Sequence, residues 1–152
     1  MIRRVGPAPR SDIRYRLRHG VYAILPMPAG LLVTFQEEPK PEMQLPGGGV
    51  DPGESPLRAL HREVMEETGW IIASPRRMGA FRRFVYMPEY DMWAEKLCSV
   101  YVARPVRAVC APTEAGHRPM TISAAEAARK LGNVGDRMFV RRWSASCGTG
   151  LP

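Results

Sequence analysis

The feature that most constrains this 152-residue chain is a glycine-rich segment that leads directly into a short helix, residues 45–70. Ser55 and Pro56 predict the start of that helix, because serine caps the first free amides and proline suits the first helical position. Gly69 predicts its end, since glycine readily adopts the left-handed conformation just past a helix. The segment therefore predicts a helix of about three and a half turns that is fixed at both ends.

Carboxylates distinguish this helix from an ordinary surface helix. Three of them fall within roughly a 100° arc, namely Glu63, Glu66 and Glu67. Residues 55–69 contain no Lys that would relieve their repulsion. Three apolar side chains fall on a different face and are expected to pack inward: Leu57, Leu60 and Val64. A hard cation such as Mg²⁺, which prefers oxygen ligands, would offset the repulsion. A solvated acidic face is the alternative interpretation.

The loop before the helix, LPGGGVDPGE, contains three consecutive glycines, Gly47, Gly48 and Gly49. Glycine allows the backbone to approach a ligand closely. Backbone amides near a helix N-terminus suit phosphate oxygens. Loop and helix together therefore favour a site for a metal ion and a phosphate group.

The same residues match, at every fixed position, the Nudix box, G-x₅-E-x₇-R-E-U-x-E-E-x-G-U with U apolar, over residues 48–70. A chance match in a chain of this length has odds on the order of 10⁻⁷. The chain therefore resembles the Nudix hydrolases. The resemblance implies an α/β fold, an α/β/α sandwich with a mixed central β-sheet. It also implies hydrolysis, with Mg²⁺ or Mn²⁺, of a nucleoside diphosphate linked to another group.

The resemblance also implies roles for individual residues. Glu66 and Glu67 are similar to the principal metal ligands of the family. Glu63 is similar to the residue that acts either as a further ligand or as the base that activates water. Gly47 or Gly48 would offer a backbone carbonyl to the metal. All three carboxylates are thus expected to be catalytic.

Two further expectations concern residues around the carboxylates. Glu54 and Arg62 resemble the pair that braces the loop against the helix, and Arg62 can also pair with Glu66 one turn on. Many relatives take one more acid from a loop after the central sheet, and Glu114 is the candidate here. His117 follows it in the same loop and is an alternative base, with an ordinary loop role as the other interpretation.

Candidate substrate contacts lie downstream, in the aromatic segment FRRFVYMPEYDMW at residues 81–93. Nucleobases stack on aromatic rings, although such rings at sheet edges commonly belong to the core. Arginines on this segment are expected to meet substrate phosphates. The expected contacts are Arg82, Arg83, Tyr86, Tyr90 and Trp93.

The remaining sequence predicts one domain, residues 13–145, between a flexible tail at residues 1–12 and another at residues 146–152. Strands are expected at residues 21–25, 31–36, 43–45, 78–85 and 97–103. Further helices are expected at residues 123–131 and 136–143. Cys98 is expected to be a small core residue.

The net charge of +7, with 19 Arg among the 22 basic residues, fits either attraction of polyphosphates and RNA or a simple bias toward arginine. The first functional hypothesis is a hydrolase of a small nucleotide. The second is a pyrophosphohydrolase of RNA 5′ ends, and the third is a non-catalytic nucleotide sensor, which usually loses carboxylates that this chain keeps. No apolar run is long enough to cross a bilayer, so we expect a cytoplasmic protein without membrane contact, with a homodimer possible.

Overall fold

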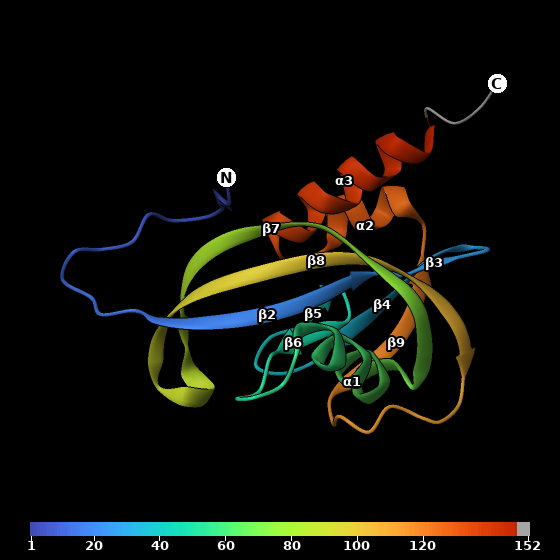
Figure 1. Ribbon diagram of the computed structural model, residues 1–152, viewed down its shortest axis with the longest axis horizontal. Coiled ribbons are helices and arrows are strands. Elements are labelled where there is room, and N and C mark those ends of the chain that lie inside the picture. The colour runs from blue at the N-terminus through green and yellow to red at the C-terminus, as the bar shows by residue number, and fades with distance from the viewer. Residues whose placement is uncertain (149–152) are drawn as a thin grey trace.

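The strands of the computed structural model form two hydrogen-bonded sheets within residues 1–148, the part of the chain that the structure describes (Figure 1). One sheet is mixed and five-stranded. Its order is β1 (Arg3–Arg4), β7 (Trp70–Met87), β8 (Met92–Ala108), β2 (Arg16–Ile24) and β6 (Gly47–Gly49). The other sheet is antiparallel and consists of β3 (Pro26–Met27), β4 (Gly30–Gln36), β5 (Glu42–Gln44) and β9 (His117–Ile122).

Helices cover both faces of this β layer (Figure 1). Helix α1 (Pro56–Thr68) lies on one face, where Leu60 and Val64 pack with Val21 and Ala23 of β2. The other face is covered by α2 (Ala124–Lys130) and α3 (Val134–Gly148), and Ile24 packs there. Alternate residues of β2 thus enter two separate cores, as the pleat of a strand requires. The predicted α/β/α sandwich is confirmed.

Helix α1 begins and ends where the sequence predicts. The Ser55 hydroxyl accepts a hydrogen bond from the Arg58 amide at 3.3 Å, and Gly69 ends the helix at φ 74°. The predicted inward face is only partly right, because Leu57 is 45% exposed in the first turn, at the edge of the buried stripe. Glu63 and Glu67 lie within that stripe instead, at 9% and 4% exposure. The helix therefore presents two of its carboxylates inward.

The N-terminal segment is more ordered than a loose tail. Arg3 and Arg4 pair in parallel with Phe81 and Arg82 of β7, and Val5 is buried in the core. The sequence predicted a flexible tail over residues 1–12, whereas residues 3–5 pair with or pack on the sheet, because the outer edge of β7 offers free backbone groups that this segment satisfies.

The C-terminal helices are close to the prediction. Ser123 caps α2 as expected. Helix α3 is longer than predicted and continues through residues 146–148, which the sequence assigned to a C-terminal tail. Residues 149–152, the rest of that predicted tail, lie outside the described residues.

Three strand features were not expected. The glycines 47–49 form a strand, not a loop, because they pair with residues 20–22 of β2. Strand β9 contains Pro119, which weakens its strand pattern, yet it pairs with β4 along its full length. Strands β7 and β8 are both far longer than predicted, since irregularities near Ala73 and Arg77 allow the pairing to continue through a polar stretch.

A candidate metal centre and hydrolytic site

The glycine strand β6 lies directly against two carboxylates of α1. The Gly47 amide donates a hydrogen bond to Glu67 Oε2 at 3.2 Å. A Cβ atom added at Gly48 would lie 2.5 Å from the Glu63 carboxyl carbon, and one at Gly47 would lie 2.1 Å from the Val21 carbonyl oxygen. Any side chain at either position would collide with its neighbours. The absence of side chains here is therefore what allows the strand and the acidic helix to touch.

Arg62 binds several groups around this contact. Its Nε and Nη2 atoms each donate to one oxygen of Glu54, both at 2.8 Å. Nη1 donates to Glu63 at 2.9 Å and to Glu66 at 3.2 Å, and Nη2 also donates to the Gly49 carbonyl at 3.0 Å. The two-pronged pairing with Glu54 and the one-turn pairing with Glu66 were both predicted. Arg62 thus connects the segment after β6 to the carboxylates of α1.

The charges of this brace reinforce each other. Hydrogen bonding to Arg62 lowers the pKa of Glu54 from 4.5 to about 2, and a bond from the Asp51 amide acts in the same direction. Glu54 in turn raises the pKa of the Arg62 guanidinium. Both groups therefore stay charged across the ordinary pH range.

Glu114 reaches the site from the loop before β9. The amides of Thr113 and Glu114 both donate to the Glu66 carbonyl, at 2.8 and 2.9 Å. That carbonyl belongs to the last turn of α1, where helix carbonyls lack partners within the helix. The docked loop places the Glu114 carboxylate so that one oxygen each from Glu63, Glu66 and Glu114 lie within 4.8 Å of one another. The fourth acid expected from the sequence is therefore next to the helix carboxylates.

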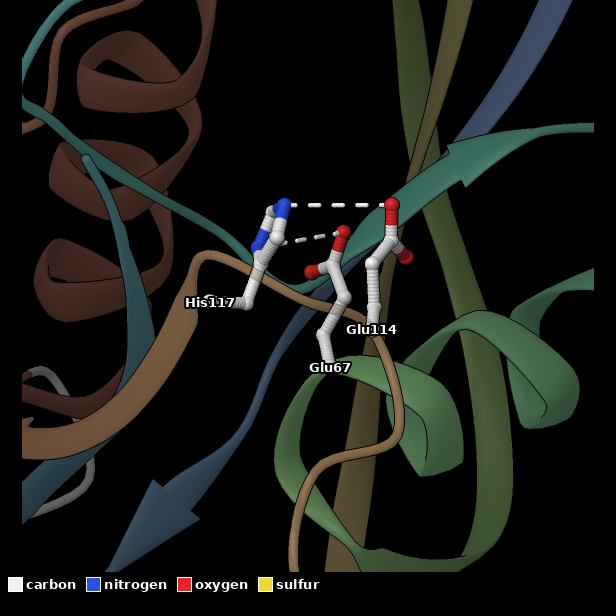
Figure 2. A group of neighbouring side chains, drawn as sticks. All are labelled: Glu67, Glu114 and His117. Atoms are coloured by element: carbon white, nitrogen blue, oxygen red, sulfur yellow. Dashed lines mark ion pairs between the residues drawn. The ribbon is translucent and has the colours of Figure 1, made fainter. Parts of the chain in front are cut away.

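His117, the first residue of β9, completes a second group with Glu67 and Glu114 (Figure 2). Its Nδ1 lies 3.7 Å from Glu67 Oε1 and 3.2 Å from the Thr34 hydroxyl, while its Nε2 lies 3.9 Å from Glu114 Oε1. Figure 2 shows the three side chains of Glu67, Glu114 and His117 pointing toward one another, Glu67 from α1 and the others from the opposite segment. Potential ligand atoms of these three also lie within 4.8 Å of one another.

Burial alters the acidity of the inner carboxylates. It raises the pKa of Glu63, although hydrogen bonding to Arg62 opposes this effect. Burial also raises the pKa of Glu67 well above its ordinary value, against the opposing hydrogen bond from Gly47, and the nearby Glu63 and Glu114 raise it further. Closely packed carboxylates of like charge provide the hard oxygen ligands that Mg²⁺ and Mn²⁺ prefer. The residues present therefore fit a divalent cation.

The five residues predicted to bind substrate lie apart from this cluster, on β7, β8 and the short turn between them. Arg82 pairs with Glu95 at 2.9 Å on the α1 side of the sheet. Arg83 is two residues from Phe81, which packs with α3, so it lies on the opposite face. The other three occupy the end of the β7–β8 pair: Tyr86, Tyr90 and Trp93.

The register of the sheet separates these rings from the carboxylates. Cys98 of β8 is level with Gly20 of β2, and Gly20 is level with Gly49 of β6. Trp93 precedes Cys98 by five residues, which corresponds to about 17 Å along a strand. The structure therefore does not gather the predicted aromatic contacts with the metal-binding residues.

Sequence reasoning placed His117 in a loop, whereas it is the first residue of β9. Its neighbour Thr34 was not singled out at all. The residues 117–122 carry only a weak strand signal, and the contact of His117 with Thr34 depends on how β9 pairs with β4. The approach of Glu114 to the helix was a prediction from the family pattern, and no local sequence signal marks it.

The chain belongs to the NUDIX domain family, whose model matches residues 16–142. It is 32% identical over 74 residues to a Bacillus subtilis protein provisionally named 8-oxo-dGTP diphosphatase. The matched segment covers 49% of this chain and 50% of that protein. The chain is 36% identical over 90 residues to an RNA pyrophosphohydrolase of Erythrobacter litoralis, 57% of this chain and 52% of that protein. The matched segments thus span about half the length of these relatives.

A solved structure supports the fold. A NUDIX hydrolase from Nitrosomonas europaea superposes with a TM-score of 0.72 at 19% identity, over 86% of this chain and 90% of the other. Identity at that level shows a common fold, and the sandwich that the sequence predicted is confirmed by it.

Proposed function

We propose that this protein is a metal-dependent hydrolase that cleaves the pyrophosphate bond of a nucleoside diphosphate linked to another moiety. The observation that supports it best is the convergence of four carboxylates, from α1 and from the loop before β9, beside the glycine strand β6. The products would be a nucleoside monophosphate and a phosphorylated partner.

The proposed ligands of Mg²⁺, or of Mn²⁺, are Glu63, Glu66, Glu67 and Glu114, with a backbone carbonyl from Gly47 or Gly48. His117 lies within the second group and is a further nitrogen donor there. A bound divalent cation polarises a phosphate oxygen and lowers the pKa of bound water.

The protein residues supply position and a proton acceptor. The Gly47 amide orients Glu67, while Arg62 orients Glu63 and Glu66. Glu63 is either a further ligand or the group that takes the proton of the attacking water, the two roles that the family pattern gives to this position. Glu54 and Arg62 hold the loop after β6 in place and take no part in the proton transfer.

A second candidate is hydrolysis at the 5′ end of RNA. It is favoured by the RNA pyrophosphohydrolase among the relatives and by exposed arginines and aromatic rings at one end of the sheet. The third candidate, a sensor without activity, is disfavoured because every carboxylate of the box is present and gathered. No helix within residues 1–148 is long and apolar enough to cross a membrane. A cytoplasmic location and a homodimer stay predictions.

The decisive experiment compares the wild-type protein with Glu66→Gln on a substrate panel in Mg²⁺ and in Mn²⁺. The panel contains nucleotide sugars, dinucleoside polyphosphates, deoxynucleoside triphosphates and triphosphorylated RNA, with released monophosphate or phosphate as the readout. We expect Glu66→Gln to lose about a thousandfold in turnover, since it removes one charged ligand at unchanged side-chain size.

Glu126→Gln is the matched control, because Glu126 lies on α2, pairs with Lys130 on the surface, and should retain full turnover. Circular dichroism would verify that both variants fold. Near-normal turnover of Glu66→Gln on its best substrate would refute the proposed function. A wild-type protein that binds nucleotides but releases no product would favour the sensor.

A further inference from the structure

An aromatic cluster surrounds the end of the β7–β8 pair. The ring of Tyr15 packs edge-on against Phe84 at 5.0 Å and against Trp93 at 6.0 Å between centroids. Tyr86 packs against Trp93 at 5.3 Å. Trp93 and Tyr86 nevertheless remain 37% and 43% exposed. The cluster therefore presents ring surface to solvent that its own packing does not cover.

Arginines border these rings. Arg14 and Arg16 are exposed and line an open hollow of about 780 Å³ together with Tyr15 and Trp93. Arg18 stands over the ring of Tyr90 at 5.0 Å. Asp91 also lines the hollow, but its carboxylate accepts a hydrogen bond from the Tyr86 hydroxyl. Two cations and two rings thus border one hollow at the end of the β7–β8 pair.

Strand β2 connects this surface to the proposed metal centre. Arg16 is level with Ala94, next to Trp93, and Gly20 is level with Gly49 of the glycine strand. Figure 1 shows the first residues of β2 beside the β7–β8 connection. Four residues separate Arg16 from Gly20, which is about 13 Å along a strand. A chain of nucleotides whose terminal phosphates occupied the metal centre would reach the rings.

We propose that this surface, made by Arg14, Tyr15, Arg16, Tyr86 and Trp93, binds the single-stranded body of an RNA whose 5′ end is held at the carboxylates. The inference rests on the second candidate function and goes beyond it by locating the RNA. Aromatic rings stack with bases irrespective of sequence, and arginines pair with the phosphates between them. A second copy of the chain would carry the same arginines and repel them, so charge favours a polyanion.

The test measures binding of a 5′-monophosphorylated, unstructured RNA by fluorescence anisotropy over a range of salt concentrations. This RNA has no anhydride bond to cleave, so binding is observed without turnover. Trp93→Ala should weaken binding by roughly five- to a hundredfold, the loss of one stacked base. Arg14→Ala/Arg16→Ala should reduce the slope of log affinity against log salt by about 1.4, since each phosphate contact on a single strand contributes about 0.7.

The matched control is Arg76→Ala/Arg104→Ala, which removes the same charge from exposed arginines at the other end of the β7–β8 pair. It should leave affinity and slope close to those of the wild type. Arg14 and Arg16 are exposed, so their replacement tests the surface even if Trp93→Ala unfolds. Hydrolysis of a mononucleotide by Arg14→Ala/Arg16→Ala should stay at the wild-type rate.

Equal losses of binding in the two double variants would overturn the proposal, because they would indicate attraction by the overall charge alone. A wild-type dimer that Trp93→Ala dissociates, as judged by light scattering, would also overturn it and assign the surface to self-association. Failure of RNA binding leaves the proposed hydrolysis of small nucleotides intact. An inactive protein that binds RNA through these residues would refute the hydrolase and retain this surface.

Discussion

The two faces of the β layer both bury charge, but they balance it differently. On the α1 face, Glu63 and Glu67 are buried beside Glu66 and Glu114, with Arg62 as a cation bonded to Glu63 and Glu66. On the α3 face a single carboxylate, Asp136, is 3% exposed in the first turn of α3. The ratio of acids to cations is therefore reversed on the α3 face, because two cations act on this one acid.

Arg83 and Lys96 are those cations. Burial raises the pKa of Asp136 from 3.8 to about 7, and the two cations, which are cross-strand partners on β7 and β8, oppose this rise. Burial also lowers the pKa of Lys96, and Arg83 lowers it further. Asp136 Oδ1 and Arg83 Nε find no hydrogen-bond partner among the described residues. The α3 face thus carries its own counter-charge, whereas the α1 face has an excess of acid that suits a cation from solution.

The largest effect expected in this comparison concerns Asp136 and pH. Its pKa is raised in the folded state, so its neutral form contributes stability that is complete below about pH 3.8 and is lost as pH rises to about 7. Asp136→Asn keeps a neutral side chain at every pH. The variant should therefore gain about 4 kcal/mol relative to the wild type between pH 4 and pH 7, and nothing further above that.

Urea denaturation of both proteins in EDTA, at one-unit steps from pH 4 to pH 8, measures this difference. The charged and titratable groups that interact with Asp136 include Arg83, Lys96, Glu42, Tyr22 and Cys98. They are common to both proteins, so most of their own pH dependence cancels in the difference. Parallel stability curves for the two proteins would show that Asp136 is ionised in the folded state well below neutral pH.

The next effect tests Arg62, the cation that is bonded to the acids of α1. Arg62→Met keeps most of the side-chain volume but leaves Glu54, Glu63 and Glu66 without their partner. We expect a loss of about 3 kcal/mol at pH 8 in EDTA, the range found when one partner of a largely buried ion pair is removed. The free energy of unfolding from urea titration measures it.

Arg10→Met is the matched control for that change. Arg10 and Asp12 form an ion pair at 2.6 Å, but their side chains are 65% and 62% exposed. Surface pairs of this kind contribute less than about 1 kcal/mol. If the two methionine variants lost equal stability, the bonds of Arg62 to the acidic helix would contribute no more than a solvated pair.

The smallest effect is the response of each face to added metal. At a concentration one hundred times its dissociation constant, Mg²⁺ should stabilise the folded protein by about 2.7 kcal/mol. The melting temperature should then rise by roughly 5–10 °C. Glu67→Gln should abolish the rise, and Asp136→Asn should retain it. A rise in melting temperature that Glu67→Gln preserves in full would place the cation elsewhere.

The sequence was most informative where the relevant contacts are local. The caps of α1 and the pairing of Arg62 with Glu54 follow from residues fewer than ten apart, and the structure confirms them. Local patterns also predicted most strands, although their ends were underestimated. The helical spacing of apolar residues did not predict the buried face of α1 correctly, because Glu63 and Glu67 lie in its buried stripe.

Two contacts across the fold that belong to no family pattern escaped prediction. His117 meets Thr34 across 83 positions of sequence, through the pairing of β9 with β4. The burial of Asp136 depends on how α3 packs: a Cβ at Gly135 would lie 2.4 Å from the ring of Phe81. Neither the contact of His117 with Thr34 nor the burial of Asp136 is marked by a hydrophobic periodicity or a sequence motif. Each therefore arises only when the whole fold is assembled.

At Thr113 and Glu114 the loop before β9 is bonded to α1 through main-chain atoms, since both amides donate to the carbonyl of Glu66. Such an attachment is indifferent to which side chains the two positions carry. A different side chain at position 114 would therefore lie at the same place beside the acids without moving the loop. A substitution at position 114 that keeps the amide would therefore change the chemistry beside the acids and leave the architecture unaltered.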